Sequence, residues 1–351
     1  MTIGIIEGFY GEDWGWSTRH ETLEFMAENA LSFFIYAPKN DRHLRAEWRT
    51  PHAEPSAMAI EAFSEACIAR QIHFGLGLTP LKLHDVWNDD GRAALVSRIH
   101  SLKRFNLHTL AILFDDMRGD FPHLAQAQAD MVHCVAEQNI AERIIMCPTY
   151  YCSPGILDRL FGARPTDYLE DLGRLLDASI DVFWTGPKVL SSHYPDEHLD
   201  DLTDTLGRKP LIWDNYPVND GPRMSKHLHL QAPERWPSML PRVSGVAINP
   251  MNQPYLSRVP IVAALTRWRG EGVADTRIET ERAIESLCSA ALARQLIADW
   301  SDFQQIGFEE LGDRRDELMG VYAQFDEPAA REVCRWLRGE YRVSAEILTD
   351  E

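Results

Sequence analysis

Two adjacent carboxylates, Asp115 and Asp116, follow the most hydrophobic run of the chain, Leu110–Phe114. Adjacent carboxylates repel each other and burial disfavours their charge, so we expect the pKa of at least one to be raised. One protonated acid beside one carboxylate is what acid–base catalysis at a glycosidic bond requires. Judged on the pair alone, a helix cap or a solvated pair is an equally good interpretation.

The spacing of the two aspartates favours one kind of glycosidase. Ordinary retaining enzymes need two carboxyl groups ~5 Å apart, supplied by different strands, which neighbours in sequence do not provide. Adjacent aspartates suit a reaction in which the substrate supplies the nucleophile. The 2-acetamido oxygen of N-acetylglucosamine can attack its own anomeric carbon, while one acid orients the amide N–H and the other protonates the leaving oxygen.

A metal site is a third interpretation of these carboxylates. The chain contains no H-x-x-x-H or H-E-x-x-H spacing. His227 and His229 lie in a polar stretch beside Lys226, where we expect solvated histidines. The six cysteines are scattered without a C-x-x-C pair, and free thiols are expected. We therefore expect no metal and no organic cofactor.

Short apolar runs alternate with helical patterns along most of the chain, as expected for strands buried on both faces of a parallel sheet. The predicted strands are Ile3–Glu7, Phe33–Tyr36, His73–Leu76, Leu110–Phe114, Arg143–Met146, Asp181–Trp184, Pro210–Trp213 and Gly245–Ile248. The predicted helices follow a capping box at Thr18 and Glu21 or run through Ser56–Arg70, Gly91–Phe105, His123–Gln138, Asp196–Leu206 and Leu256–Trp268.

Eight strand–helix units of this size predict an α/β fold, a (β/α)8 TIM-type barrel over residues 1–272. A doubly wound open sheet is the competing architecture, but it usually carries a glycine fingerprint after its first strand. That position is occupied here by Glu7-Gly8-Phe9-Tyr10-Gly11, which does not match the fingerprint.

The pattern changes near residue 276, and a C-terminal α-helical region is predicted over 276–351. Strand signals stop, and amphipathic helices are predicted over Thr280–Gln304, Phe308–Gln324 and Pro328–Leu348. A helical extension that packs on the barrel is favoured over a second active unit. This region is also a candidate surface for assembly into a homo-oligomer.

Catalytic residues of a barrel lie at the carboxyl ends of its strands. Carboxylates, amides and aromatic rings gather at these ends, a mixture that is typical of a sugar pocket. The segments concerned are Glu7–Tyr10, Tyr36–Lys39, Asp115–Asp116, Pro148–Tyr151, Trp184–Pro187, Trp213–Tyr216 and Asn249–Asn252.

These segments, taken in order from Ile3 to about Pro260, resemble glycoside hydrolase family 84, the family of O-GlcNAcases and bacterial hyaluronidase-like hexosaminidases. The most specific stretches are Ile5-Ile6-Glu7-Gly8-Phe9-Tyr10-Gly11, Tyr36-Ala37-Pro38-Lys39-Asn40-Asp41, Phe114-Asp115-Asp116, Pro148-Thr149-Tyr150-Tyr151, Phe183-Trp184-Thr185-Gly186-Pro187, Trp213-Asp214-Asn215-Tyr216-Pro217-Val218-Asn219-Asp220 and Asn249-Pro250-Met251-Asn252. Any one of these motifs would be weak support, but seven in sequence are specific.

The resemblance implies a role for each matching residue. Asp115 would orient and deprotonate the acetamido nitrogen, and Asp116 would act as general acid and then base. Tyr151 would donate a hydrogen bond to the acetamido oxygen or to the intermediate. The remaining implied residues contact the sugar: Trp213, Cys147 and Thr185 as walls of the N-acetyl pocket, Asn215 near the acetamido group, and Lys39, Asp220, Asn249 and the carbonyl of Gly8 on the hydroxyls.

Each of these residues also has a structural interpretation. Lys39 could be a surface ion-pair partner, Asp220 and Asn249 could form turns, and Trp213 and Cys147 could be plain core. Taken singly these interpretations would usually win, but the joint occurrence of the residues at matching strand ends favours function.

The sequence departs from the family pattern in two respects. Asn40 and Tyr150 replace residues that are more often acidic, a change expected at the rim of the pocket. The first residues are predicted to form the first barrel strand, and we expect the α/β domain that usually precedes the barrel in the family to be missing. This affects the expected recognition of outer sugars and polymers, and not the cleavage of a terminal sugar.

The predicted function is that of a retaining exo-β-N-acetylglucosaminidase acting on β-linked N-acetylglucosamine of a glycoprotein or oligosaccharide. An endo-acting hyaluronidase-type hexosaminidase and a catalytically silent glycan-binding barrel are the alternatives. The net charge of −18 over 351 residues argues against nucleic acid or an anionic membrane as partner. No signal peptide and no apolar run of ~20 residues is apparent, so a cytoplasmic protein is expected.

Overall fold

A computed structural model describes residues 2–234 and 237–343 of the protein. In this part of the chain eight strands form a closed barrel in the order of the sequence, and the pairs from β1 to β7 are parallel. The strands are β1 (Thr2–Glu7), β2 (Phe33–Tyr36), β3 (His73–Leu78), β4 (Thr109–Leu113), β5 (Arg143–Cys147), β6 (Asp181–Trp184), β7 (Leu211–Asp214) and β8 (Gly245–Ile248). The predicted TIM-type barrel is confirmed, and each predicted strand lies within two residues of the observed one.

The helices of the described residues fall into a set that follows the strands and a set near the C-terminus. The first set is α1 (Trp16–Glu28), α2 (Glu54–Ala69), α3 (Asp89–Ser101), α4 (Leu124–Ala136), α5 (Ile156–Phe161), α6 (Tyr168–Leu175), α7 (Asp196–Leu206) and α8 (Pro254–Trp268). The second set is α9 (Thr276–Leu287), α10 (Ala290–Ala298), α11 (Arg314–Tyr322) and α12 (Pro328–Leu337). The 3-10 turns are η1 (Arg42–Leu44), η2 (His84–Val86), η3 (Lys103–Phe105), η4 (Met224–Lys226) and η5 (Pro237–Arg242), and Asp302–Ile306 forms a π-helical turn, η6.

The chain divides into two compact units, each assembled from separate stretches. The barrel unit comprises Met1–Gly8, Gly15–Asp214 and Ser238–Ala247. The helical unit comprises Phe9–Trp14, Asn215–Pro237 and Ile248–Glu351. The sequence-based boundary between residues 272 and 276 stays a prediction.

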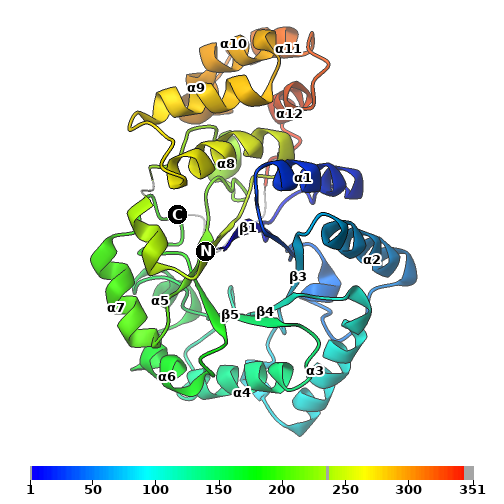
Figure 1. The fold of residues 1–351 in the computed structure, drawn as a ribbon, viewed down its shortest axis with the longest axis vertical. Helices are drawn as coiled ribbons and strands as arrows, with labels where there is room; N and C mark the ends of the chain where they lie inside the picture. The colour runs from blue at the N-terminus through cyan, green and yellow to red at the C-terminus, as the bar shows by residue number, and fades with distance from the viewer. Residues whose placement is uncertain (1, 235–236, 344–351) are drawn as a thin grey trace. The chain divides into compact units, whose positions relative to one another are not determined.

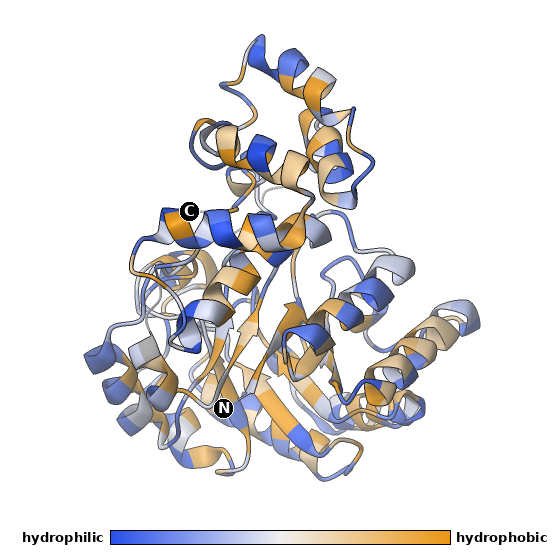
Figure 2. Cartoon of the chain, turned by 45° about the horizontal axis from the view of Figure 1, so that its top comes forward, coloured by the Kyte–Doolittle hydropathy of each residue, from blue (hydrophilic) through white to orange (hydrophobic). Residues whose placement is uncertain are grey.

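The barrel unit derives its core from strands that are apolar on both faces. Residues of β2 and β4 such as Phe34, Ile35, Leu110 and Ile112 are fully buried. Helices α2, α3, α4, α6 and α7 lie outside the ring of strands (Figure 1). The strands are coloured mainly as hydrophobic, whereas the surrounding helices alternate between polar and apolar residues (Figure 2). Because the strands are buried on both faces, their positions are fixed, and so are the positions of the polar motifs that follow their carboxyl ends.

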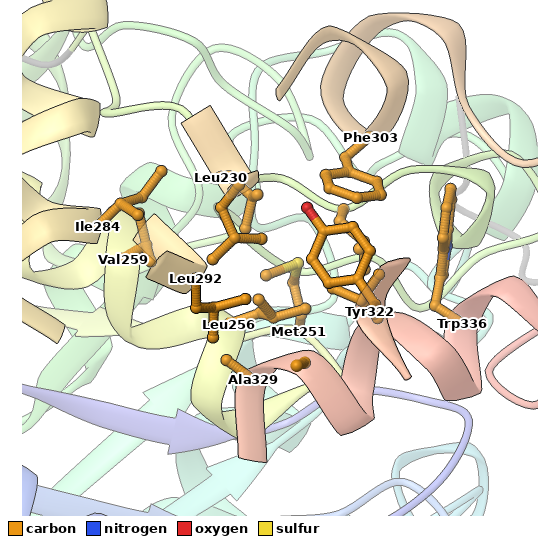
Figure 3. Packing of buried hydrophobic residues seen from close by; sticks show 14 of the residues in the cluster. Leu230, Met251, Leu256, Val259, Ile284, Leu292, Phe303, Tyr322, Ala329 and Trp336 are labelled. Carbon is orange, nitrogen blue, oxygen red and sulfur yellow. The ribbon is translucent and has the colours of Figure 1, made fainter. Parts of the chain in front are cut away.

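The helical unit has a hydrophobic cluster of its own. Figure 3 shows Leu230, Met251 and Leu256 gathered with aromatic residues from the C-terminal helices. Phe303 packs edge-on against Tyr322 and Trp336, with ring centroids 5.6 and 5.8 Å away. Burial of these apolar side chains is the main source of stability for the helical unit.

Several expected boundaries were wrong, each for a local reason. Helix α1 begins at Trp16 after Gly15, so Thr18 lies inside the helix and is not its cap. The predicted helix Thr280–Gln304 is interrupted where Cys288 is extended and the Ser289 hydroxyl caps α10 by accepting from the Leu292 N–H. Phe308–Gln324 is helical only from Arg314 to Tyr322. The last predicted helix ends at Leu337, and its residues 344–348 lie outside the described part.

Candidate active site

The aspartate pair lies where strand β4 ends. Leu113 is opposite Cys147 of β5, so the two strand ends are neighbours. Asp115 is buried, with 6% of its surface exposed, and Asp116 has a left-handed backbone with φ of 54°. The Tyr151 hydroxyl, from the end of β5, donates a hydrogen bond of 3.1 Å to Oδ1 of Asp116. Side chains from two strands therefore meet at the pair.

Asp115 forms a buried ion pair with Lys39, which follows strand β2. Burial by itself raises the pKa of Asp115, but the charges of Lys39 and Arg45 and the hydrogen bond from Lys39 together hold that pKa below its usual range. The rise in pKa expected for at least one of the two carboxyl groups does not occur at Asp115, because two cations from the loop after β2 outweigh desolvation. Asp115 is consequently a carboxylate at neutral pH.

Trp213, at the end of β7, provides an aromatic face beside this ion pair. Lys39 Nζ lies 5.5 Å from the centroid of the Trp213 ring, and Phe183 packs edge-on against the ring at 5.2 Å. A Cβ added to Gly8, after β1, would lie 2.5 Å from Trp213 Cζ2. Only glycine lets the backbone approach the ring this closely, which gives a physical reason for glycine at a position singled out by the sequence.

Cys147 and Thr185 complete the predicted barrel-unit set at β5 and β6. Burial, followed by the nearby Asp115 charge, raises the pKa of the Cys147 thiol, which therefore stays neutral. The Thr185 N–H donates to the carbonyl of Tyr151 over 2.9 Å, and its hydroxyl lies 2.9 Å from the carbonyl of Lys188. The structure thus brings Asp115, Asp116 and the other six predicted residues of the barrel unit to the ends of six strands.

The other three predicted residues belong to the helical unit. Asn249 Nδ2 donates to Oδ1 of Asn215 over 3.0 Å. Oδ2 of Asp220 accepts a hydrogen bond of 2.8 Å from the backbone N–H of Tyr10. Asn215 is therefore paired with Asn249, while Asp220 fixes the Tyr10 backbone within the same unit.

Two other residues are not as the sequence suggested. Tyr150, expected at a pocket rim, is fully buried and donates from its hydroxyl to the Gly162 carbonyl over 2.7 Å. His229, expected to be solvated, is buried, and burial followed by the nearby His227 lowers its pKa to about 3. In both cases tertiary packing covers a side chain that sits among polar neighbours in the sequence.

No role was predicted from the sequence for several charged residues of the loop after β2. Arg45 is half-buried and acts electrostatically on Asp115. Asp41 accepts hydrogen bonds from the Tyr36 hydroxyl and the His43 N–H, and His52 lies against the same carboxylate. An arginine, two histidines and an aspartate within one loop after a predicted strand end were the available signal.

Among the described residues, no three His, Cys, Asp or Glu side chains are grouped so that they could bind a metal ion. The six cysteines, all in the described part, are free thiols. Within the same part, no helix has the length and apolar character needed to cross a membrane.

Comparison with known proteins places this geometry in context. A family model described as β-N-acetylglucosaminidase matches residues 3–298. The O-GlcNAcases of Mus musculus and Rattus norvegicus are each 28% identical over 275 residues, covering 76% of this chain but only 29% of their own length. A solved structure of a mutant O-GlcNAc hydrolase from Thermobaculum terrenum has a TM-score of 0.77 and 28% identity, over 96% of this chain and 80% of that one.

Proposed function

The chain belongs to the β-N-acetylglucosaminidases of glycoside hydrolase family 84, and we propose that it removes terminal β-linked N-acetylglucosamine with retention of configuration. The observation that supports this most directly is the ionised Asp115 beside Asp116. Lys39 and Arg45 keep Asp115 as a carboxylate despite its burial. Asp116, the neighbouring carboxyl group, contacts Tyr151.

The proposed first step uses the acetamido group of the substrate as nucleophile. Its carbonyl oxygen attacks the anomeric carbon, Asp115 accepts the amide proton, and Asp116 protonates the leaving oxygen as its bond to carbon breaks. A neutral oxazoline results. Tyr151, whose hydroxyl donates to Asp116, would turn this hydroxyl to the acetamido oxygen.

The second step reverses these roles. Asp116, now a carboxylate, takes a proton from water as the water attacks the anomeric carbon. The oxazoline nitrogen recovers its proton from Asp115 as the ring opens. Two inversions at the same carbon give a β-configured product.

We propose the sugar contacts that the sequence predicted. Trp213, Cys147 and Thr185 would enclose the N-acetyl group, and Lys39 and the Gly8 carbonyl would bind hydroxyls. Asn215, Asp220 and Asn249 keep their predicted roles as ligands of the sugar. The physiological substrate would be a glycoprotein or an oligosaccharide, and assembly through the helical region and a cytoplasmic location stay predictions from the sequence.

Hydrolysis of an aryl β-N-acetylglucosaminide, followed by proton NMR, tests the proposal. The β-anomer should appear first, and the matched aryl glucoside should be cleaved negligibly because it lacks the amide oxygen. A thiazoline that mimics the oxazoline should bind far more tightly than the product. Comparable turnover of the glucoside would contradict substrate assistance.

These assays, together with digestion of a hyaluronan-like polymer, separate the alternatives. A catalytically silent glycan-binding barrel would bind the thiazoline or the sugar without turnover. An endo-acting hexosaminidase would cleave hyaluronan-like polymers internally, yielding oligosaccharides in preference to the free monosaccharide.

A further inference from the structure

The backbone of Asp116 is unusual for a residue with a side chain. Its φ of 54° lies in the left-handed region, which non-glycine residues adopt seldom and aspartate more readily than most. Such a conformation persists where the surrounding structure fixes the chain on both sides. The contacts that do this at Asp116 also determine where its carboxyl group points.

Before the aspartate pair, both polar groups of Phe114 are fixed. Its N–H donates to the Cys147 carbonyl over 2.9 Å, and its carbonyl accepts from the Thr149 hydroxyl over 2.8 Å. Thr149 Oγ1 in turn accepts from Nε2 of Gln128 on α4, again over 2.8 Å. These buried contacts hold the point at which the chain enters the pair.

After the pair, one peptide unit is bound from both sides. The carbonyl of Arg118 is 2.7 Å from Nε2 of His84, and the N–H of Gly119 donates to the Phe161 carbonyl at the end of α5 over 2.8 Å. Because a carbonyl only accepts, the His84 Nε2 carries the hydrogen. The Arg118–Gly119 peptide, two residues beyond Asp116, therefore cannot rotate without breaking two hydrogen bonds.

His84 is built into this position by packing. Its side chain is 1% exposed, and its ring contacts Phe114 and Phe121 edge-on with centroids 6.3 and 5.6 Å away. Oδ1 of the neighbouring Asp85 is 3.1 Å from the same Nε2, and Nδ1 has no hydrogen-bond partner in the described part of the chain. Burial lowers the pKa of His84, which favours the neutral ring. Burial of a polar ring is costly unless the ring is hydrogen-bonded, and the Arg118 carbonyl makes the shorter of the two contacts of Nε2.

We propose that His84 is a positioning residue for the general acid. By holding the Arg118 carbonyl it fixes the left-handed turn at Asp116 and keeps that carboxyl group aligned with the leaving oxygen. This inference rests on the proposed function, because it assumes that Asp116 protonates the leaving group. In this proposal His84 acts through the Arg118 carbonyl and is assigned no contact with the substrate.

The test is a series of aryl β-N-acetylglucosaminides, from dinitrophenyl to unsubstituted phenyl, assayed by kcat/KM. In His84→Leu the loss should grow as the leaving group worsens, from about threefold to about 10–50-fold, because a small misplacement of the acid matters most where protonation is needed. His84→Asn is polar but too short to reach the carbonyl, and should behave like His84→Leu. His84→Gln keeps an N–H donor of suitable reach and should restore most of the wild-type slope.

A purely structural role would give another result. Partial unfolding lowers the active fraction and reduces kcat/KM by one factor across the whole series, leaving the slope unchanged. His198→Leu is the matched control, because His198 is half-buried and accepts from Trp184 Nε1 over 3.0 Å without touching the Asp116 turn. Its slope should equal that of the wild type.

The outcome also separates this inference from the proposed function. If Asp116→Asn steepens the slope and His84→Leu and His84→Asn do not, the positioning role is wrong while the general acid stands. If Asp116→Asn leaves the slope unchanged, the proposed function fails first. Thermal unfolding of each variant identifies any that is not folded. If His84→Leu does not fold, the slope of His84→Asn decides the test.

Discussion

Each of the two compact units buries a carboxylate, and the two carboxylates respond in opposite ways. Asp115 of the barrel unit and Glu332 of the helical unit are 6% and 5% exposed. The pKa of Asp115 is held below its usual range by Lys39 and Arg45, although burial acts against them. Burial raises the pKa of Glu332 to about 8, although the Tyr255 and Leu256 N–H groups and two arginines oppose it.

The difference lies in what surrounds each group. Asp115 is in direct contact with a cation, Lys39. Glu332 instead accepts hydrogen bonds of 3.0 and 2.8 Å from backbone N–H groups in the first turn of α8. Glu332 caps a helix and so contributes to the fold, whereas the ionised state of Asp115 fits the part in catalysis that we propose for it. The fact that a pKa is perturbed does not distinguish the two groups, but the direction of the shift and its cause do.

The largest expected effect separates the two aspartates of the barrel unit. Asp116→Asn should slow substrates with poor leaving groups by about 10²–10⁴-fold, because general-acid catalysis is lost. Activated aryl substrates should form the intermediate almost normally and then stall, and azide should restore turnover as a β-glycosyl azide. Asp115→Asn should lose a similar factor with every leaving group, without azide rescue. Steady-state kinetics with both variants measures this.

Identical leaving-group dependence in the two variants would contradict the division of labour. The reverse assignment would follow if azide rescued Asp115→Asn alone. In either case the role proposed for Asp115, and with it the functional contrast between Asp115 and Glu332, would be wrong.

A second prediction makes Asp115 resemble Glu332. Lys39→Met removes the buried cation, so desolvation should raise the pKa of Asp115 and move the acid limb of the kcat/KM profile to higher pH. The value of kcat/KM is highest at pH values above the pKa of Asp115 and falls as the pH drops through that pKa. We expect a loss of about 10–100-fold near neutral pH, because a charged contact to the sugar is lost as well. Lys39→Arg keeps the charge and should keep the wild-type limb.

The barrel was predictable because its strands are buried on both faces, which leaves an apolar signature in sequence. Helices α5 and α6 were not predicted. Helix α5 follows a Ser-Pro-Gly turn, and Gly155 before it has a φ of 140°. The six residues of α5 are too few to show a helical pattern in the sequence. The sequence therefore predicts strands that form the core better than short helices defined by tertiary contacts.

The candidate site was predictable as far as the strand ends determine it. Lys39, Tyr151 and Trp213 were placed by the motifs that follow their strands, and the roles of these residues stay predictions. The ion pair of Lys39 with Asp115 and the left-handed turn at Asp116 were not predictable. Both depend on contacts among residues far apart in the sequence. Without the contact to Lys39, burial would raise the pKa of Asp115, whereas with it the pKa is lowered.

The third prediction concerns Glu332 and stability. Its folded-state pKa of about 8 lies above the ordinary 4.5, so folding favours the protonated form. The stability that Glu332 contributes is fully present below about pH 4.5 and is lost as the pH rises through about 8. Glu332→Gln removes this dependence. The difference in unfolding free energy, wild type minus variant, should fall by about 1.4 kcal/mol per pH unit at most within that window. Denaturant unfolding at several pH values measures it, and a difference that is constant with pH would mean that Glu332 is ionised.

The smallest expected effect comes from Arg45, the second cation near Asp115. The charge of Arg45 lowers the pKa of Asp115 by less than the charge of Lys39 does. Arg45→Gln should therefore move the acid limb of the kcat/KM profile to higher pH by about half a pH unit. Near neutral pH, kcat/KM should stay within about threefold of wild type, because Lys39 still keeps Asp115 ionised. Arg42→Gln, which removes an exposed arginine from the same loop, should leave the limb in place. If Arg45→Gln and Arg42→Gln shift the limb equally, the effect is one of overall charge, and Lys39 alone distinguishes Asp115 from Glu332.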